Sequence, residues 1–155
     1  MRKFKREVKE KAEIYEIIKG CEVLSLALHD GEFPYVIPLN FGAEFDGESF
    51  TLYFHCAKEG KKIDLIRQNN KAAFEMNCSR RLVGGDKACD YTMKFESVCG
   101  TGEIDIIEDF EEKRAALESL MKQYGGEGKP MHEAAINMVG VLRLRVGEIT
   151  GKRSK

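Results

Sequence analysis

Apolar residues recur along this chain with two different periods, and the change of period marks out the expected helices and strands. Near the N-terminus, Ile14, Ile17 and Ile18 are spaced as on one face of a helix over residues 12–19. Gly20 follows directly, which predicts a glycine that ends the helix in the left-handed conformation. The segment is therefore expected to be a short amphipathic helix that leads into the rest of the fold.

The next three apolar runs are typical of β-strands joined by tight turns. They are CEVLSLALH (21–29), FPYVIPLNFGAEF (33–45) and SFTLYFHC (49–56), separated by Asp30-Gly31 and Asp46-Gly47. Asp-Gly between such runs favours type I′ hairpins, in which both central residues have positive φ. The sequence therefore predicts a three-stranded antiparallel meander over 21–56. Pro34 and Pro38 in its middle strand cannot donate to a ladder, so they indicate an edge, a bulge or a place that something other than a strand approaches.

The remaining pattern predicts two more helices and three more strands. A short helix runs to about Gln68, strands cover 72–78, about 93–107 and 138–150, and residues 79–90 form a loop. Asp109 and Glu112 form an acidic variant of a capping box, and helical spacing continues from there to Gly125-Gly126. Six strands with three helices, joined by hairpins first and helices later, predict a mainly β fold, a small antiparallel barrel. Nothing divides residues 1–155, so a single domain is expected.

Composition and charge narrow the function classes. Lys and Arg total 25 against 26 Asp and Glu, for a net charge of −1, which disfavours a nucleic-acid binder. The five cysteines form no CxxC pair, which is typical of free thiols in a reducing compartment. The N-terminal MRKFKREVKEKAE lacks an apolar signal core, and no apolar run is long enough to span a membrane. A cytoplasmic protein is expected.

The densest polar cluster lies where the strand at 49–56 leads into the next helix. It covers Tyr53 to Lys62, with the sequence YFHCAKEGKK. Helix N-termini offer unpaired N–H groups and a positive dipole end, and Gly60 with two lysines adds room and charge, so a phosphate site is one interpretation. The other is that Lys58, Lys61 and Lys62 are the solvated face of a short helix. Spacing alone does not choose between them.

Individual candidates in the sequence each have a structural alternative. His55 can be a hydrogen-bonded packing residue instead of a functional one. Cys56 beside it points to the opposite strand face, which argues against a Cys–His nucleophile pair. Cys78 and Cys89 lack the paired spacing of a zinc site, so no metal is expected.

Two further segments carry weaker signals. Glu96 and Ser97 lie on opposite faces of the strand at 93–107, so one of them is expected to face the interior or a ligand crevice. The C-terminal GKRSK is expected to be a frayed basic tail.

Five segments in order along nearly the whole chain resemble one known family. They are PYVIPLNF, LYFHCAKEGKKIDLI, FESVCGTGEI, EKRAALESLMKQY and EITGKRS. Together they resemble the pyridoxamine 5′-phosphate oxidase-like, flavin-binding split barrels, and within these the nitroimidazole-resistance (NimA-type) branch. The resemblance implies a six-stranded split barrel that forms a homodimer, with FMN in a crevice at the dimer interface.

The resemblance also implies which residues contact FMN. They are Ile37, Pro38, Leu39, Asn40, Phe54, His55, Cys56, Lys61, Lys62 and Ser97. Residues 37–40 would offer strand backbone and the Asn40 amide to the flavin ring and ribityl chain. Lys61 and Lys62 would neutralise the phosphate, His55 and Cys56 would line the phosphate or ring end, and Ser97 would add a hydrogen bond. His55 is the residue expected to be catalytic.

The implied activity is that of an FMN-dependent oxidoreductase. NAD(P)H would visit the exposed flavin only transiently, because no GxGxxG motif is present, and the acceptor would be small, such as a nitro-aromatic. Relatives that oxidise pyridoxamine phosphate carry arginine among the phosphate contacts, which argues against that substrate here.

Three alternatives stay open at this stage. The first is a non-enzymatic flavin carrier or redox sensor that uses the same pocket. The second is another flavin or haem in place of FMN. The third is a nucleic-acid-binding barrel using Phe41, Tyr53 and Phe54, which the charge balance disfavours.

Overall fold

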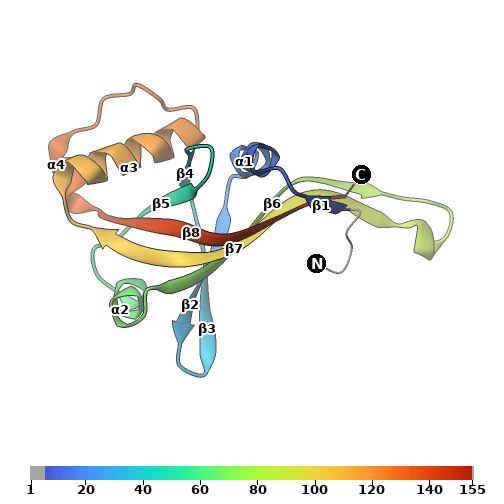
Figure 1. Ribbon diagram of the computed structural model, residues 1–155, viewed down its shortest axis with the longest axis horizontal. Coiled ribbons are helices and arrows are strands. Elements are labelled where there is room, and N and C mark those ends of the chain that lie inside the picture. Colours follow the sequence, from blue (N-terminus) through green and yellow to red (C-terminus); the bar gives the residue numbers. More distant parts are fainter. Residues whose placement is uncertain (1–5, 155) are drawn as a thin grey trace.

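A computed structural model describes residues 6–154, which form a curved antiparallel sheet flanked by helices (Figure 1). Its strands are β1 (Glu7–Val8), β2 (Leu24–Asp30), β3 (Phe33–Leu39), β4 (Gly42–Phe45), β5 (Phe50–Cys56), β6 (Lys71–Val83), β7 (Thr92–Ile107) and β8 (Gly140–Arg153). Its α-helices are α1 (Lys11–Lys19), α2 (Lys61–Gln68), α3 (Phe110–Gln123) and α4 (Glu133–Met138), and a 3₁₀ turn covers Ala88–Asp90. Residues 1–5 of the charged N-terminal segment and Lys155 of the GKRSK segment lie outside the described residues.

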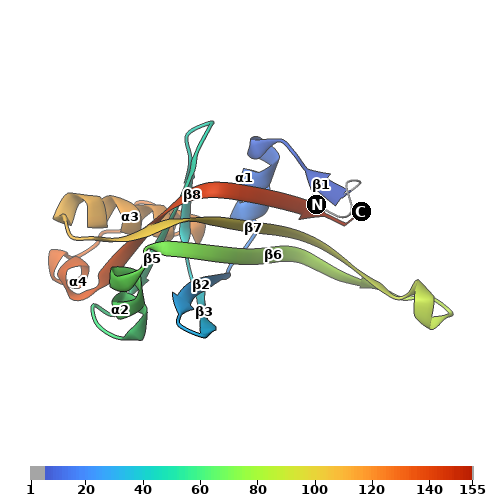
Figure 2. The same ribbon diagram turned by 60° about the horizontal axis from the view of Figure 1, so that its bottom comes forward.

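The strands follow the spatial order β3-β2-β6-β7-β8-β5-β4, and β1 pairs with β8. The long strands β6, β7 and β8 run side by side through the middle of the molecule, and the far end of the β6–β7 pair extends beyond the body as an arm (Figure 2). The β2–β3 and β4–β5 pairs lie at opposite ends of this order. The expected mainly β, antiparallel split barrel is therefore confirmed.

Alternation along the strands decides which face is buried. On β2, Leu24, Leu26 and Leu28 are buried, while Ser25 and Ala27 between them are partly exposed. α1 contributes its three predicted isoleucines to the same core, and α2 adds Ile63, Leu65 and Ile66. The core thus lies on one face of the sheet, and the other face of β2, β6 and β7, here called the outer face, carries small and polar residues.

The strand count is eight in the described residues instead of the expected six, and the predicted meander is wrong. β3 pairs with β2, but β4 pairs with β5, and β3 and β5 lie far apart in the sheet order. The apolar run at 33–45 divides at Phe41, which is fully buried and is followed by buried Gly42. Two consecutive buried residues break the period-two alternation of a strand. A side chain on Gly42 would meet the backbone of Leu120 at 2.5 Å, so the chain turns into close contact with α3 here.

Two turn predictions are corrected in detail. Gly20 has φ −80°, in the right-handed region, so α1 does not end on a left-handed glycine. The first hairpin pairs Asp30 with Phe33, which makes Gly31 and Glu32 its central residues. Only Gly31 has positive φ (62°), so the turn has the II′ pattern instead of I′.

Three segments have more regular structure than the sequence predicted. The expected loop at 79–90 is largely the end of β6 and the 3₁₀ turn. The expected tail is strand, because Arg153 ends β8 and pairs with Glu96, and the Ser154 N–H donates to the Phe95 carbonyl oxygen. The short helix α4 was not predicted. In contrast, the Asp109 cap is confirmed, because its side chain accepts from the Glu112 N–H at 2.9 Å.

Among residues 6–154, no helix is long and apolar enough to cross a membrane. The same residues contain no group of three His, Cys, Asp or Glu side chains that could hold a metal ion. All five cysteines are free thiols.

Candidate functional site

The start of α2 lies against the β2–β3 hairpin. Lys61 Nζ is 2.5 Å from an Asp30 carboxylate oxygen and 5.2 Å from the centre of the Tyr35 ring. These contacts join the end of β2, the middle of β3 and the first turn of α2. Because the ion pair and the ring both hold the ammonium group, Lys61 has a fixed position and part of its charge is already neutralised.

Lys62 has different surroundings. It is half-buried, and its positive charge acts on the Cys56 thiol at the end of β5. Burial raises the pKa of Cys56 above its ordinary value, and Lys62 offsets this only in part. Cys56 is therefore a protonated thiol at neutral pH and is not an activated nucleophile.

The first turn of α2 offers free backbone donors. No side chain among residues 6–154 caps this helix, and Gly60 precedes it with φ +118°. Uncapped N–H groups at a helix start bind anions, and Lys62 adds a full positive charge beside them. Exposed His55 lies next to Cys56 on β5. The structure thus places Lys62 near Cys56 and Lys61 against Asp30, whereas His55 lies on the opposite face of β5 from Cys56.

β3 presents an edge beside this cluster. Its one neighbour in the described sheet is β2. Every second residue of β3 therefore has a backbone N–H and C=O that point away from β2 and are not paired with another strand. Proline fits an edge strand only where its nitrogen faces away from the ladder. Since Pro34 and Pro38 have the same parity, we expect the backbone groups of residues 34, 36 and 38 to lie on the free edge. The side chains of Ile37 and Leu39 pack against the core, and by the same parity their backbone groups face β2, so these two residues offer a ligand little.

Three predicted contacts are placed elsewhere. Phe54 has 0% exposure and lies in the core. The Asn40 side-chain NH₂ donates to the Glu22 carbonyl and to the Tyr124 hydroxyl, both at 3.2 Å, so its donors are already used. Ser97 pairs with Lys152, whereas His55 pairs with Val141, eleven residues away along β8. At ~3.3 Å per residue this separation is about 36 Å, so Ser97 and His55 do not meet within one chain.

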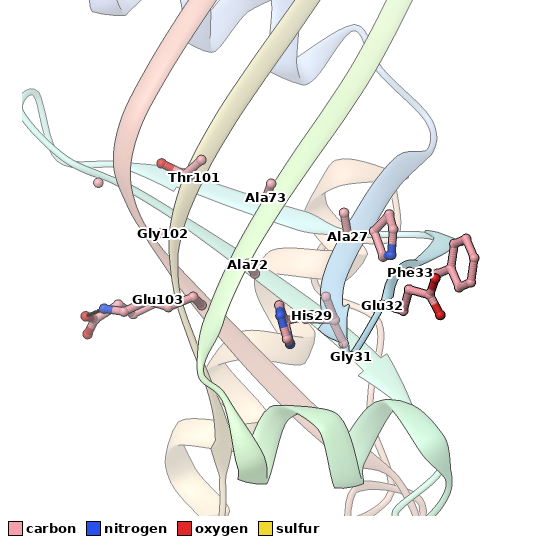
Figure 3. Close-up of a pocket in the computed structure, with 14 residues that line it drawn as sticks. Ala27, His29, Gly31, Glu32, Phe33, Ala72, Ala73, Thr101, Gly102 and Glu103 are labelled. Atoms are coloured by element: carbon pink, nitrogen blue, oxygen red, sulfur yellow. Dashed lines mark hydrogen bonds and ion pairs between the residues drawn. The ribbon is translucent and has the colours of Figure 1, made fainter.

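A cavity of about 670 Å³ opens on the outer face, between β2, β3, β6 and β7 (Figure 3). Small residues form its floor, among them Ala27, Ala73 and Gly102, and Phe33 stands at its rim. Of the residues that the structure describes, those predicted from sequence do not line this cavity. By strand register His55 shares its sheet face with Thr101 and Glu103, which do.

Comparison with known proteins identifies the chain. The family model described as pyridoxamine 5′-phosphate oxidase matches residues 10–153. The chain belongs to this family. A search of curated proteins found no match.

Solved structures agree with the family assignment. A candidate 5-nitroimidazole antibiotic resistance protein from Bacteroides thetaiotaomicron shares 35% identity and a TM-score of 0.81, covering 94% of this chain and 85% of the other. A NimC/NimA family protein from Clostridium acetobutylicum shares 23% identity and a TM-score of 0.64, covering 94% and 87%. The FAD and heme binding protein from Mycobacterium smegmatis shares 16% identity and a TM-score of 0.82, covering 97% and 74%. The last two likenesses show the fold alone.

Sequence reasoning missed several residues that shape this member of the pyridoxamine 5′-phosphate oxidase family. Asp30 and Tyr35 fix Lys61, and Tyr124 holds the end of β3, because its hydroxyl accepts from Asn40 and Phe41 and donates to the Glu22 carbonyl at 2.6 Å. These contacts span distant parts of the chain. The outer-face cavity did have a local signal, since the alternation of Leu with Ser25 and Ala27 on β2 marks a face of small residues.

Proposed function

We propose that this protein is an FMN-binding oxidoreductase that passes hydride or electrons from a transiently bound nicotinamide donor to a small acceptor such as a nitro-aromatic. The observation that carries the proposal is the start of α2, where uncapped N–H groups and Lys62 lie near Cys56 at the end of β5 and near the free edge of β3. The same end of β5 carries exposed His55. The 35% identity to a candidate nitroimidazole resistance protein supports this acceptor class.

The donor set at this cluster fits a flavin mononucleotide. A phosphate dianion would accept from the first N–H groups of α2 and would be neutralised by Lys62, with Lys61 as a second, partly committed charge. Backbone groups on the edge of β3 would orient the polar edge of the flavin ring. Cys56, uncharged because its pKa is raised, would line the site without competing for the phosphate.

Bound FMN would supply the hydride and electron transfer. The chain's own contribution is to bind, to orient and to hold a proton. His55 is exposed at the strand end, and an imidazole can carry a proton near neutral pH. We propose that its ring nitrogen delivers that proton to the acceptor as the acceptor is reduced.

A second copy of the chain would complete the site. Ser97 lies about 36 Å from His55 along the sheet, so both can contact one flavin only if Ser97 comes from a partner. The edge strand β3 exposes two large apolar side chains, Phe33 at 71% and Val36 at 57%. Exposed apolar groups of this size are typical of interfaces, which supports a homodimer with FMN between the subunits.

The test is the absorbance spectrum of the purified protein, followed by identification of any cofactor released on denaturation. Oxidised-flavin bands and released FMN are expected. Release of FAD or haem would replace the cofactor, and a colourless protein that also fails to bind added FMN would overturn the proposal.

The second test separates an enzyme from a carrier. Anaerobic mixing with NADH or NADPH should bleach the flavin, and a nitro-aromatic acceptor should restore its colour. A flavin that neither donor reduces would favour the alternative function, a flavin carrier or redox sensor.

A further inference from the structure

Two thiols meet where α1 ends against β6. Cys21 lies just beyond α1, and its Sγ donates to the Ile17 carbonyl oxygen at 3.2 Å. Cys78 lies on β6, and its Sγ approaches the same oxygen at 3.7 Å. One carbonyl therefore holds together two sulfur atoms that are 57 positions apart in the sequence.

Gly20 lies beside both Cys78 and the shared carbonyl. A Cβ at this position would lie 3.4 Å from Cys78 Sγ and 3.4 Å from the Ile17 carbonyl oxygen, which are ordinary van der Waals distances. The sulfur of Cys78 therefore packs directly against the end of α1.

The two cysteines differ in access. Cys21 is buried, with 2% exposure, whereas Cys78 is half-buried. Ser79 Oγ donates to Cys78 Sγ at 3.7 Å, and a Glu96 carboxylate oxygen lies 4.0 Å from the same sulfur. A small oxidant arriving from solvent would therefore meet Cys78 before Cys21.

The backbone beside Cys78 is irregular. Ser79 has φ +55°, and the register between β6 and β7 shifts between Cys78 and Arg81. A disulfide needs a narrow range of Cα separations, and a bulge is a place where a strand can shift locally to reach it. This irregularity lies directly beside Cys78.

We infer that Cys21 and Cys78 form a reversible intramolecular disulfide when a hydroperoxide oxidises Cys78. The Cys78 thiolate attacks the peroxide, whose O–O bond breaks as an S–O bond forms, giving a sulfenic acid and an alcohol, or water from hydrogen peroxide. Cys21 sulfur then attacks this sulfur, an S–S bond forms, and the hydroxyl leaves as water with the Cys21 proton. Two thiols lose two electrons in total, and the peroxide gains them.

Burial raises the pKa of Cys21 far above its ordinary value, and nearby Cys78, Glu75 and Glu96 add to the shift. Because the thiolate is the reactive form, Cys21 resolves the sulfenic acid and does not initiate. The same shift makes the second step slow, so the bond is expected under sustained oxidation and not from brief exposure.

The test treats the purified full-length protein with hydrogen peroxide, blocks remaining thiols with N-ethylmaleimide, and maps disulfides by protease digestion and mass spectrometry. A peptide pair joining Cys21 to Cys78, two hydrogens lighter than the reduced pair and lost on adding dithiothreitol, is expected. The inference is overturned if peroxide yields no such pair, or if the Cys21–Cys78 pair is no more abundant than pairs involving the exposed Cys89 and Cys99. The test needs neither flavin nor substrate, so its outcome is separate from that of the proposed function.

Variants then test the order of the two steps. In Cys21→Ser, peroxide should leave a sulfenic acid on Cys78 that dimedone traps, whereas Cys78→Ser should leave Cys21 unlabelled. Cys99→Ser is the matched control and should form the disulfide as the wild type does. Dimedone on Cys21 in the Cys78→Ser protein would contradict the assigned order.

Discussion

Lys61 and Lys62 are neighbours on α2, but their side chains have different contacts. Lys61 is tied to Asp30 and Tyr35, while Lys62 has no ion pair among the contacts of residues 6–154 and sits beside Cys56. We expect Lys62→Gln to weaken FMN binding about tenfold, equivalent to ~1.4 kcal/mol, because a charge-assisted contact to phosphate is lost. Titration of the flavin-free protein with FMN, followed by flavin fluorescence, measures this affinity.

Arg67→Gln is the control for Lys62→Gln, because it removes the same charge from the other end of α2. It should leave FMN affinity within about a factor of two of the wild type, since exposed charges at this distance are screened by salt. Equal weakening in both variants would mean that α2 attracts the flavin only through its overall charge.

His55 is the residue predicted to act in the chemistry. His55→Gln keeps a polar side chain but cannot carry a proton, so turnover should fall by about 10²-fold while FMN affinity changes much less. Steady-state reduction of a nitro-aromatic with NADH measures turnover, and the FMN titration described for Lys62→Gln measures affinity. Unchanged turnover would contradict the catalytic role, and a parallel loss of affinity would make His55 a binding residue.

The nearness of Lys62 to Cys56 could be predicted because it is local, with the end of β5 and the start of α2 five residues apart. The surroundings of Asn40 could not, because they depend on Tyr124, 84 residues further along the chain. Phe54 is similar. The alternation of β5 shows that it faces away from His55, but only the packed fold shows that its face is completely buried.

Among the elements, β8 differs most from its prediction. Its last residues are tied to the rest of the sheet, since Arg153 binds the Glu96 carboxylate on β7 and reaches Glu13 of α1 at 3.1 Å. From the local sequence alone, the basic segment GKRSK after the alternating run looks like an unpaired tail. Its acidic partners lie 57 and 140 residues away in the chain, so no local pattern could identify them.

The ion pairs of Arg153 with Glu96 and Glu13, here called the clamp, predict that the stability of the fold depends on pH. The hydrogen bond from Arg153, with a smaller one from Ser79, holds the pKa of Glu96 below its ordinary 4.5. A carboxyl whose pKa is lowered by folding contributes stability above its unfolded pKa and loses it as pH falls through the folded value. Glu96→Gln should therefore cost about 1 kcal/mol near pH 7 and progressively less as the pH falls below 4.5, measured as the free energy of urea unfolding.

Glu16→Gln is the control for the clamp. It removes an exposed pair with Lys19 on α1, 2.8 Å long, and should cost less than about 0.5 kcal/mol throughout the same pH range. A cost for Glu96→Gln that stays constant as the pH falls would show that packing, and not the charge of Glu96, holds the end of β8.

At the scale of the whole molecule, the fold class could be predicted but the strand order could not. Tight turns and alternation identify hairpins such as β2–β3. Pairing of β2 with β6, and of β5 with β8, joins segments far apart in the sequence, and nothing in the periodicity of either segment selects the partner. The predicted meander failed for this reason, since it assumed that strands adjacent in sequence are adjacent in the sheet.

The proposed homodimer gives a prediction at this scale. Val36→Glu places a charge at an exposed apolar position of the edge strand β3. It should therefore convert the proposed dimer to a monomer and also weaken FMN binding. Light scattering coupled to size-exclusion chromatography measures the mass. Met138→Glu, at an exposed apolar position on α4, is the control and should remain dimeric. A monomeric wild type that binds FMN normally would contradict the shared site.

β8 pairs with β1, β5 and β7, and thereby joins strands made early in synthesis to strands made late. During synthesis, β5 and β7 each keep one unpaired backbone edge until β8 has emerged, because β8 is the strand that covers that edge in the described sheet. Unpaired edges invite pairing with other chains. The nascent protein is therefore expected to depend on chaperones during translation far more than the finished protein does, and to complete its fold only after β8 has left the exit tunnel.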